Sequence, residues 1–305
     1  MAFSIKTASR WLGGGAVALV AGLGLSTGAS ASCILETLAD VPIEIQGPRA
    51  IVDTGSSTTL LLPAAAARLG LTPQPLRGID FYGVGGAADA RFVRVHFQLP
   101  GADMPQFGMI VAGHRASDAD GLLGASYLLQ SDIDFDFPDK RLRLIRPKGC
   151  NGDQVVYWGK AYSVAPLRAD PSRKIILVDV KLNGHTMRAE LDTGASISIV
   201  TSDAARAAGV APHGPDSAPA GALRGVGARK VAGFHAVFDT FSLGGETIRN
   251  AHLTVADVFA ADTVTPTASH IPEQVIETPD MILGADFFRS HHVYAALSQR
   301  KVYVS

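Results

Sequence analysis

The sequence predicts an all-β fold of two homologous, β-barrel-like lobes with a cleft between them. Three observations carry this prediction: long segments occur twice, the copies keep the same order, and most apolar runs alternate as strands do. The copies are roughly 140 residues apart, far more than the 20 to 50 residues of a solenoid repeat. Each copy is therefore expected to form a lobe of domain size.

Two gapless alignments define the duplication. Residues 53–71 (DTGSSTTLLLPAAAARLGL) align with residues 192–210 (DTGASISIVTSDAARAAGV) at an offset of 139 residues. Residues 120–144 align with residues 280–304 at an offset of 160 residues. The second pair contains an apolar-apolar-Gly motif in both copies, namely Leu122, Leu123 and Gly124 in the first and Ile282, Leu283 and Gly284 in the second.

The composition bounds the class of protein. The chain has 305 residues, of which 47% are hydrophobic and 18% charged, enough apolar material for packed cores and unlike a disordered or fibrous chain. A net charge of -1 without a basic patch gives no sign of a nucleic-acid partner. Arg141, Arg143 and Arg146 alternate with apolar residues, which predicts the solvent face of a strand.

The N-terminus resembles a secretory signal peptide. Lys6 and Arg10 precede an apolar stretch, residues 11–25, and then Ala29-Ser30-Ala31, so we expect residues 1–31 to be removed by cleavage near Ala31. The mature protein is then periplasmic or secreted. No later segment approaches the 20 or so apolar residues of a membrane span, so we expect none.

The chain has two cysteines, Cys33 and Cys150, and both remain after this cleavage. In an oxidising compartment such a pair predicts a disulfide between the mature N-terminus and the end of the first lobe. Two unpaired thiols, or a lipid on Cys33, are the alternatives.

The first lobe is assigned to residues 32–147. Apolar periodicity and turn residues predict strands at 41–45, 50–52, 91–99 and 107–111, a buried strand ending at 122–124, and a hairpin of 133–137 with 141–145. A strand pair joined by the turn 46–48 is expected at its start. The Ala-rich segment 63–69 predicts a short helix, and 126–130 a single helical turn.

Residues 148–174 are predicted to connect the lobes, with one strand near residues 154–158. The second lobe is assigned to residues 175–305 and begins with strands at 175–182 and 187–191 around Asn183-Gly184, the strongest hairpin dipeptide in the chain. The Pro-containing segment 259–278 is an insertion, either bordering the cleft or simply tolerated at the surface.

The duplicated Asp-Thr-Gly supplies the candidate chemistry. Asp53 and Asp192 each follow an apolar run at a tight turn, and two such turns facing each other bring both carboxylates into one site. Two adjacent carboxylates share one proton, so one can serve as base toward a water while the other serves as acid. This chemistry needs neither a metal nor a cofactor, and we expect neither.

With these motifs the chain resembles the aspartic endopeptidases of the pepsin and retropepsin type, over nearly the whole mature chain. The resemblance implies the acid-protease fold, a single-chain monomer with pseudo-twofold symmetry, peptide or protein substrates, and Asp53 and Asp192 as catalytic residues. It also implies that Thr54 and Thr193 interlock the lobes. The remaining implied loop residues are Gly55, Ser56, Gly194 and Ala195, and the apolar-apolar-Gly motifs are implied to thread beside these loops.

The resemblance also implies two flaps that close over the substrate. Tyr82, Gly83, Val84 and Gly85 correspond to the flap of the first lobe, and Gly225, Val226 and Gly227 to that of the second. Arg224 takes the place of the tyrosine in the second copy, so the flaps are not equivalent. Outside this context, both glycine runs would be interpreted as ordinary turns.

Two asymmetries separate the catalytic loops. Ser56 in the first loop corresponds to Ala195 in the second, so a hydroxyl hydrogen bond is expected at Asp53 only. This would leave the shared proton on Asp192. Glu190 takes the place of Ile51 and is expected to face outward on an alternating strand.

Two further interpretations are weaker. His291-His292 is unsuited to one metal, because adjacent strand residues point to opposite faces. A protease-shaped protein that binds peptides without cutting them is the alternative function.

Overall fold

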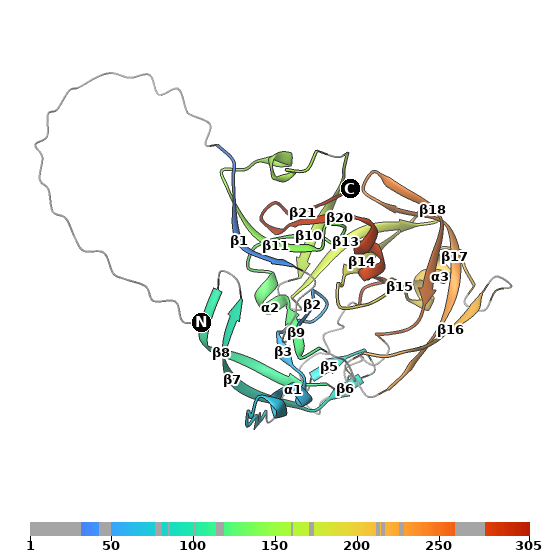
Figure 1. Cartoon of the computed structure of the whole chain (residues 1–305). Helices are drawn as coiled ribbons and strands as arrows, with labels where there is room; N and C mark the ends of the chain where they lie inside the picture. The colour runs from blue at the N-terminus through green and yellow to red at the C-terminus, as the bar shows by residue number, and fades with distance from the viewer. Residues whose placement is uncertain are drawn as a thin grey trace, which may run out of the picture. The chain divides into compact units, whose positions relative to one another are not determined.

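The structure is a computed structural model that describes residues 32–42, 50–76, 81–84, 86–99, 102–113, 119–159, 161–170, 174–211, 214, 217–225, 229–259 and 278–305. Ser32–Ser305 form one compact unit, whose described part is mostly β-strand (Figure 1). The predicted signal peptide and most of the predicted insertion at 259–278 lie outside the described residues. In the described part, no helix is long and apolar enough to cross a membrane.

The first lobe is built on a six-stranded sheet in the order β2-β9-β3-β8-β7-β4. Its strands are β2 (Ala50–Asp53), β3 (Leu60–Leu61), β4 (Gln74–Pro75), β7 (Ala90–Leu99), β8 (Ala102–Ala112) and β9 (Gly121–Gly124). The central strand β9 is buried along its whole length and pairs parallel to β2 and antiparallel to β3. Burial on both faces explains its uninterrupted apolar sequence.

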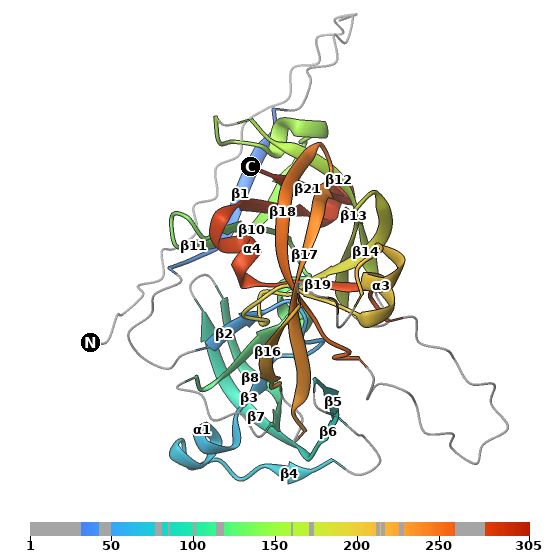
Figure 2. The ribbon, with the colours of Figure 1, turned by 90° about the vertical axis from the view of Figure 1, so that its right-hand side faces the viewer.

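The second lobe repeats this arrangement in the order β14-β19-β15-β18-β17-β16. Its strands are β14 (His185–Leu191), β15 (Ile199–Val200), β16 (Ala218–Leu223), β17 (Val231–Leu243), β18 (Glu246–Val255) and β19 (Met281–Leu283). The β14–β19 and β15–β18 pairs are parallel, as their counterparts β2–β9 and β3–β8 are. Figure 2 shows the long β17–β18 hairpin of this lobe. The same strand order and the same parallel pairs confirm the internal duplication and the two-lobed, all-β fold.

Six further strands, to which both halves contribute, run in the order β1-β11-β10-β20-β21-β12, and through β13 (Ile175–Leu182) they continue into the second-lobe strands as one 13-stranded sheet. They are β1 (Ile34–Pro42), β10 (Asp132–Asp136), β11 (Arg141–Lys148), β12 (Ser163–Asp170), β20 (His292–Ala296) and β21 (Lys301–Val304). We call these six strands the shared sheet. At its centre β10 pairs antiparallel with β20, and Asp134 lies opposite Tyr294. These two residues are equivalent in the repeat, so the local twofold axis passes between them.

The four short α-helices of the described residues also occur as equivalent pairs. The first pair is α1 (Pro63–Arg68) and α3 (Ser202–Ala207), and the second is α2 (Ala125–Leu128) and α4 (Ala285–Ser290). Helix α1 starts with proline, which has no main-chain N–H; the first N–H groups of a helix have no partner within the helix, so this costs no hydrogen bond. Helix α3 is instead capped by the Thr201 side chain. The predicted helix at 63–69 and the helical turn at 126–130 are confirmed to within a few residues.

An apolar core extends through both lobes. The ring of Phe135 from β10 meets that of Phe288 from α4 at 5.1 Å, an edge-on contact between the two halves. Both side chains are fully buried. Aromatic pairs of this geometry add to the stabilisation that burial of their apolar surface provides.

The hairpins at 133–145 and 175–191 are confirmed. In the second, β13 (Ile175–Leu182) and β14 flank Asn183 and Gly184, which have the positive φ values, 48° and 83°, that a tight hairpin turn needs. The predicted pairing across residues 46–48 is wrong for the described strands on either side. Strand β1 pairs with β11, and β2 pairs with β9, because both are drawn into larger sheets. The turn itself lies outside the described residues.

The connection differs from its prediction. Residues 154–158 form no strand, and Gly152–Val155 is a 3-10 helix, η1, with a reciprocal capping box between Asn151 and Gln154. The strand in this region is β12, which pairs with β21 and β13 and so completes the shared sheet. The sequence of β12 shows no sustained periodicity, because polar and charged residues interrupt its apolar pattern.

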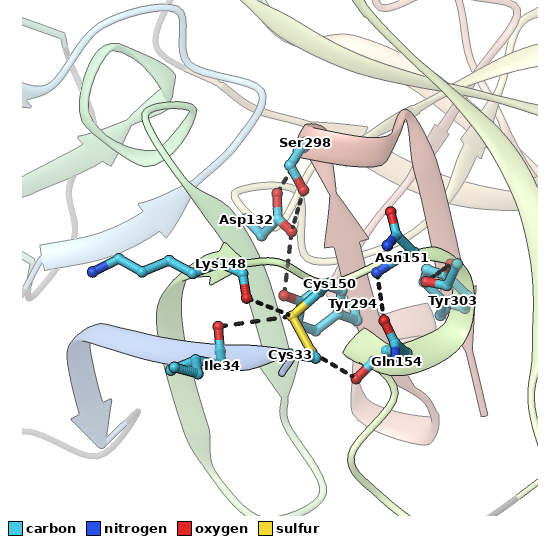
Figure 3. The surroundings of a disulfide bond; sticks show 11 residues. Cys33, Ile34, Asp132, Lys148, Cys150, Asn151, Gln154, Tyr294, Ser298 and Tyr303 are labelled. Carbon is cyan, nitrogen blue, oxygen red and sulfur yellow. Dashed lines mark hydrogen bonds between the residues drawn. A yellow bond between two sulfur atoms is a disulfide. The ribbon is translucent and has the colours of Figure 1, made fainter. Parts of the chain in front are cut away.

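A disulfide joins Cys33 to Cys150, as the cysteine count predicted, and closes a separation of 117 residues (Figure 3). It lies beside the pairing of Ile34 with Lys148, at the outer end of β1. The following 3-10 helix is held against the shared sheet, because the hydroxyl of Tyr303 donates to the carbonyl of Gly152 at 2.9 Å. The disulfide thus fixes both the first strand and the start of the connection.

Candidate active site

The two Asp-Thr-Gly turns meet at the boundary between the lobes. Asp53 ends β2 and Asp192 follows β14, and in both cases the strand before the turn lies in a packed sheet. A Cβ atom added to Gly55 would lie 2.4 Å from Cγ of Asp192, and one added to Gly194 would lie 2.2 Å from Cγ of Asp53. Each glycine therefore packs directly against the carboxylate of the other lobe, where no side chain fits.

The carboxylates of Asp53 and Asp192 are also hydrogen-bonded to each other. The main-chain N–H of Ser56 donates to Oδ1 of Asp53 at 2.9 Å. Oδ1 of Asp192 accepts from the N–H groups of Gly194 and Ala195, at 2.8 and 3.2 Å. Burial raises the pKa of Asp192, although these N–H donors and Asp53 oppose the shift. Asp192 thus favours the protonated form more than an ordinary aspartate.

The threonines after each aspartate cross between the lobes. The hydroxyl of Thr54 donates to the carbonyl of Leu191 at 2.6 Å, and that of Thr193 donates to the carbonyl of Val52 at 2.7 Å. Each hydroxyl also accepts the main-chain N–H of the other threonine, at 3.3 and 3.1 Å. The two turns are thereby locked together by four buried hydrogen bonds related by the pseudo-twofold axis.

The expected hydrogen bond from the Ser56 side chain to Asp53 is not what the structure shows. The hydroxyl of Ser56 donates to the carbonyl of Thr58 at 2.8 Å, and a serine has one proton to donate. The turn brings the main-chain N–H of Ser56, rather than its side chain, to the carboxylate. Since Ala195 offers the same N–H to Asp192, the Ser/Ala difference does not distinguish the two aspartates by a hydroxyl.

The expectation that Glu190 faces outward is also wrong, because only 4% of it is exposed. Strand β14 is flanked by β13 and β19, so Glu190 lies opposite Leu177 on one side and Ile282 on the other, inside the sheet. Alternation predicts exposure only for a strand that has one face in water.

The apolar-apolar-Gly motifs lie beside the turns and are bonded to them. In the first lobe, the N–H of Ala125 donates to the carbonyl of Ser56 at 2.8 Å. In the second, the N–H of Ala285 donates to the carbonyl of Ala195 at 2.7 Å. A Cβ on Gly124 would lie 2.2 Å from the carbonyl oxygen of Thr58, so glycine is required for this close approach.

A polar brace reinforces each contact, and the two braces differ. Ser198 donates to Asp286 through both its N–H, at 2.8 Å, and its hydroxyl, at 2.7 Å, while its Oγ accepts the N–H of Gly284. The first lobe uses Thr59 and Ser126 at the equivalent positions, with the N–H of Thr59 donating to Oγ of Ser126 at 3.0 Å. No recognised motif marks these residues in the sequence, although both pairs stand at matching positions of the repeat.

The candidate flaps are described in part. Strands β5 (Phe81–Gly83) and β6 (Gly86–Ala88) pair as a hairpin that contains Tyr82 and Gly83. Val84 packs against apolar residues of the second lobe, and a Cβ on Gly225 would lie 2.5 Å from its Cβ. The two glycine-containing segments thus meet. Gly85, Val226 and Gly227 lie outside the described residues.

No group of three or more His, Cys, Asp or Glu side chains with the arrangement of metal ligands occurs in the described part of the chain. His291 and His292 bind different partners. His291 contacts the carbonyl of Phe287 and the Glu246 side chain, whereas His292 contacts Asp134.

Comparison with known proteins places these features in a family. The profile of the family described as aspartyl protease matches residues 37–127 and 178–287, one stretch in each half. A structural comparison aligns the chain with a retropepsin-like aspartic protease from Rickettsia conorii at 12% identity and a TM-score of 0.31, covering 48% of this chain and 94% of that one. No curated protein matches the chain. With both halves matched over most of their length, the chain belongs to the aspartyl protease family.

Proposed function

We propose that this protein is an aspartic endopeptidase in which Asp53 and Asp192 activate a water between them. The observation that carries the proposal is the facing pair of hydrogen-bonded carboxylates, each packed against the glycine of the opposite turn. Two carboxylates this close cannot both be ionised without strong repulsion. At working pH the pair then holds one proton, which provides a base and an acid in the same site.

In the proposed reaction, Asp53 is the ionised member and Asp192 carries the proton. Asp53 removes a proton from the water while the water oxygen attacks the peptide carbonyl carbon. At the same time Asp192 donates its proton to the carbonyl oxygen. The tetrahedral intermediate collapses when its hydroxyl proton returns to Asp192 and the proton on Asp53 passes to the leaving nitrogen. The C–N bond breaks, and the pair regains its starting state.

This assignment rests on the raised pKa of Asp192, which favours the protonated form. The crossed threonines support it further, because they fix the two turns relative to each other before substrate arrives. The substrate would be a peptide lying between the lobes, with the hairpin at Phe81–Ala88 above it. A periplasmic or secreted location and a monomeric state are part of the same proposal.

The test compares Asp53→Asn and Asp192→Asn with the parent protein on a mixed peptide library. Each variant is expected to lose peptide cleavage by a factor of at least about 10² to 10⁴, because each removes one proton-transfer group. Asp203→Asn, at an exposed aspartate of α3, is the matched control and should cleave normally. Turnover by either dyad variant would contradict the mechanism. A parent protein that binds peptides but cleaves none would favour the binding-protein alternative.

A further inference from the structure

A second group of ionisable side chains lies at the centre of the shared sheet, outside the proposed active site. It consists of Asp134 and Asp136 from β10, Arg143 from β11, His292 from β20, and Tyr157 from the connection. We call these five residues the interlobe cluster. Strands β10 and β20 come from different halves, so the cluster joins the two lobes at the local twofold axis.

Asp134 is the centre of the interlobe cluster and is fully buried. Its Oδ2 accepts from Nη1 of Arg143 at 2.7 Å and from the hydroxyl of Tyr157, and its Oδ1 contacts Nε2 of His292. Nη1 of Arg143 also contacts Oδ2 of Asp136, at 3.2 Å. The contact between Asp134 and His292 therefore crosses from one half of the chain to the other.

The cluster has no counterpart elsewhere in the duplication. By the repeat, Asp134 corresponds to Tyr294, Asp136 to Ala296 and Arg143 to Tyr303. The alternating Arg pattern predicted that Arg143 faces solvent, but its side chain is only 19% exposed, because residues of the connection cover this face of the sheet. An arrangement present in one copy only is not required to build a lobe.

The net charge of the interlobe cluster depends on His292 alone across the neutral pH range. Two carboxylates and one guanidinium leave a net charge of -1, and a protonated His292 brings it to zero. Burial works to lower the pKa of Arg143, but the hydrogen bonds to Asp134 and Asp136 and the neighbouring charges outweigh it, so this pKa is raised. Burial and Asp134 raise the pKa of Tyr157. Arginine thus stays charged and tyrosine neutral. An uncompensated charge is costly in a buried site.

The other groups near His292 do not supply the positive charge that would balance the interlobe cluster. The indole of Trp158 packs on the His292 ring with 4.2 Å between the ring centroids and a tilt of 35°, and the main chain of His292 exchanges two hydrogen bonds with the main chain of Ser305. On its own strand, Tyr294 donates to Asp132, which Ser298 also contacts. Asp40 on β1 lies 3.8 Å from Arg143, but Arg141 pairs with it and balances its charge.

We propose that His292 is a pH-sensitive link between the two lobes. Its contact with Asp134 stabilises the association of the lobes when the imidazole is protonated, and stabilises it less when the imidazole is neutral. Imidazole is the side chain that ordinarily changes charge between pH 5 and 8. The added stabilisation requires the protonated imidazole and is lost when the imidazole is neutral. The proposal does not depend on the peptidase function, because it concerns the stability of the folded chain.

The first test measures urea unfolding of the full chain at pH 5.5 and pH 8.0, for the parent protein and His292→Gln. The parent is expected to have a lower midpoint at pH 8.0, and His292→Gln should lose at least half of that difference. His291→Gln is the matched control, since the neighbouring histidine lies outside the cluster and contacts Glu246 instead. An unchanged difference in His292→Gln, or an equal loss in His291→Gln, would overturn the proposal.

The second test reverses the sign of the effect. Asp136→Asn removes one negative charge, so the cluster is balanced when His292 is neutral and has an excess positive charge when it is protonated. The main-chain N–H of Asp139 keeps its acceptor, because asparagine retains the Oδ1 carbonyl. Asp136→Asn also removes the Oδ2 acceptor of Arg143 at both pH values, so the diagnostic is the pH dependence: its midpoint should rise from pH 5.5 to pH 8.0, opposite to the parent. The same shift at both pH values would contradict the charge argument.

The fluorescence of Trp158 reports on the protonation of His292 in the folded protein. Trp11 and Trp158 are the two tryptophans, and a protein that begins at Ser32 keeps Trp158 as the single reporter. A protonated imidazole packed on an indole quenches its fluorescence, and the emission should rise as the pH increases from 5 to 8. Adding His292→Gln should abolish this rise. A flat titration in the protein that begins at Ser32, or one that persists without His292, would exclude His292 as the titrating group.

Discussion

Gly55 and Gly194 decide how closely the two aspartates approach. Each glycine occupies the space between its own turn and the carboxylate of the other lobe, so the separation of Asp53 and Asp192 is set by backbone packing. The crossed hydroxyls of Thr54 and Thr193 hold the same geometry through hydrogen bonds. At the residue scale, the geometry of the site depends on the absence of a side chain at Gly55 and Gly194, the third residue of each Asp-Thr-Gly motif.

We expect Gly55→Ala to abolish peptide cleavage and to lower the free energy of unfolding by about 1 to 3 kcal/mol, because the new methyl group overlaps the Asp192 carboxylate. Peptidase assays and urea unfolding check both effects. Gly159→Ala is the control, since a Cβ there meets no atom within 4 Å. Retention of full activity by Gly55→Ala would show that the turns separate easily.

The raised pKa of Asp192 makes a prediction about stability. Burial keeps this carboxyl protonated to a higher pH in the folded chain than in the unfolded chain. Its contribution is therefore fully present below the unfolded pKa and is lost as the pH rises through the folded pKa. Asparagine does not ionise, so the Tm of Asp192→Asn should fall less than that of the parent between pH 4 and pH 7. Thermal scans at both pH values check this, and equal changes for parent and variant would refute it.

At the scale of the elements, each Asp-Thr-Gly turn is supported by a strand and a short helix from the other end of its own lobe. Strand β9 with helix α2 supports the Asp53 turn, and β19 with α4 supports the Asp192 turn. The first brace uses a neutral hydroxyl pair, whereas the second uses the carboxylate of Asp286. Hydrogen bonds to an ionised acceptor are the stronger kind.

We predict that Asp286→Ser, which copies the first brace, retains activity within about tenfold of the parent. Asp286→Leu leaves the N–H and hydroxyl of Ser198 without their acceptor, which costs about 1 to 3 kcal/mol for each buried group. It should lower kcat at least tenfold while KM changes little, because the turn and not the substrate site is disturbed. Steady-state kinetics on the two variants provide the measurement. Equal activity of Leu and Ser variants would mean that Asp286 does not position the turn.

At the scale of the whole molecule, the two lobes are held together by the crossed turns, the common apolar core and the shared sheet. The disulfide adds a covalent link at the edge of that sheet and fixes β1 to the start of the connection. A link across 117 residues restricts the unfolded chain more than it changes the folded one.

Replacing Cys33 and Cys150 by serine should lower the free energy of unfolding by about 2 to 5 kcal/mol. Activity at low temperature should be retained, since the disulfide lies away from both turns. Urea unfolding of the double variant and of the reduced parent provides the comparison. Identical midpoints for oxidised and reduced parent would show that the link contributes nothing.

The sequence by itself determined the duplication, the strand-rich fold and the residues that meet in the site. Repetition is visible along the chain, and local periodicity depends on neighbours a few positions away. The disulfide was also predictable, because two cysteines permit one intramolecular pairing. Where these local signals were strong, as at Asn183-Gly184 and at Pro63, the predicted elements were confirmed.

Only the tertiary structure decided which partner each polar side chain contacts and which strands pair. It turned the Ser56 hydroxyl to Thr58, buried Glu190 between two strands, and brought β12 into the shared sheet. It also gathered Asp134, Arg143 and His292, which alternation alone had assigned to solvent or left without a role. The physical reason is that the direction and burial of a side chain depend on what packs against its strand or turn, which local periodicity does not show: Ile282 lies 92 positions from Glu190, and His292 lies 158 positions from Asp134.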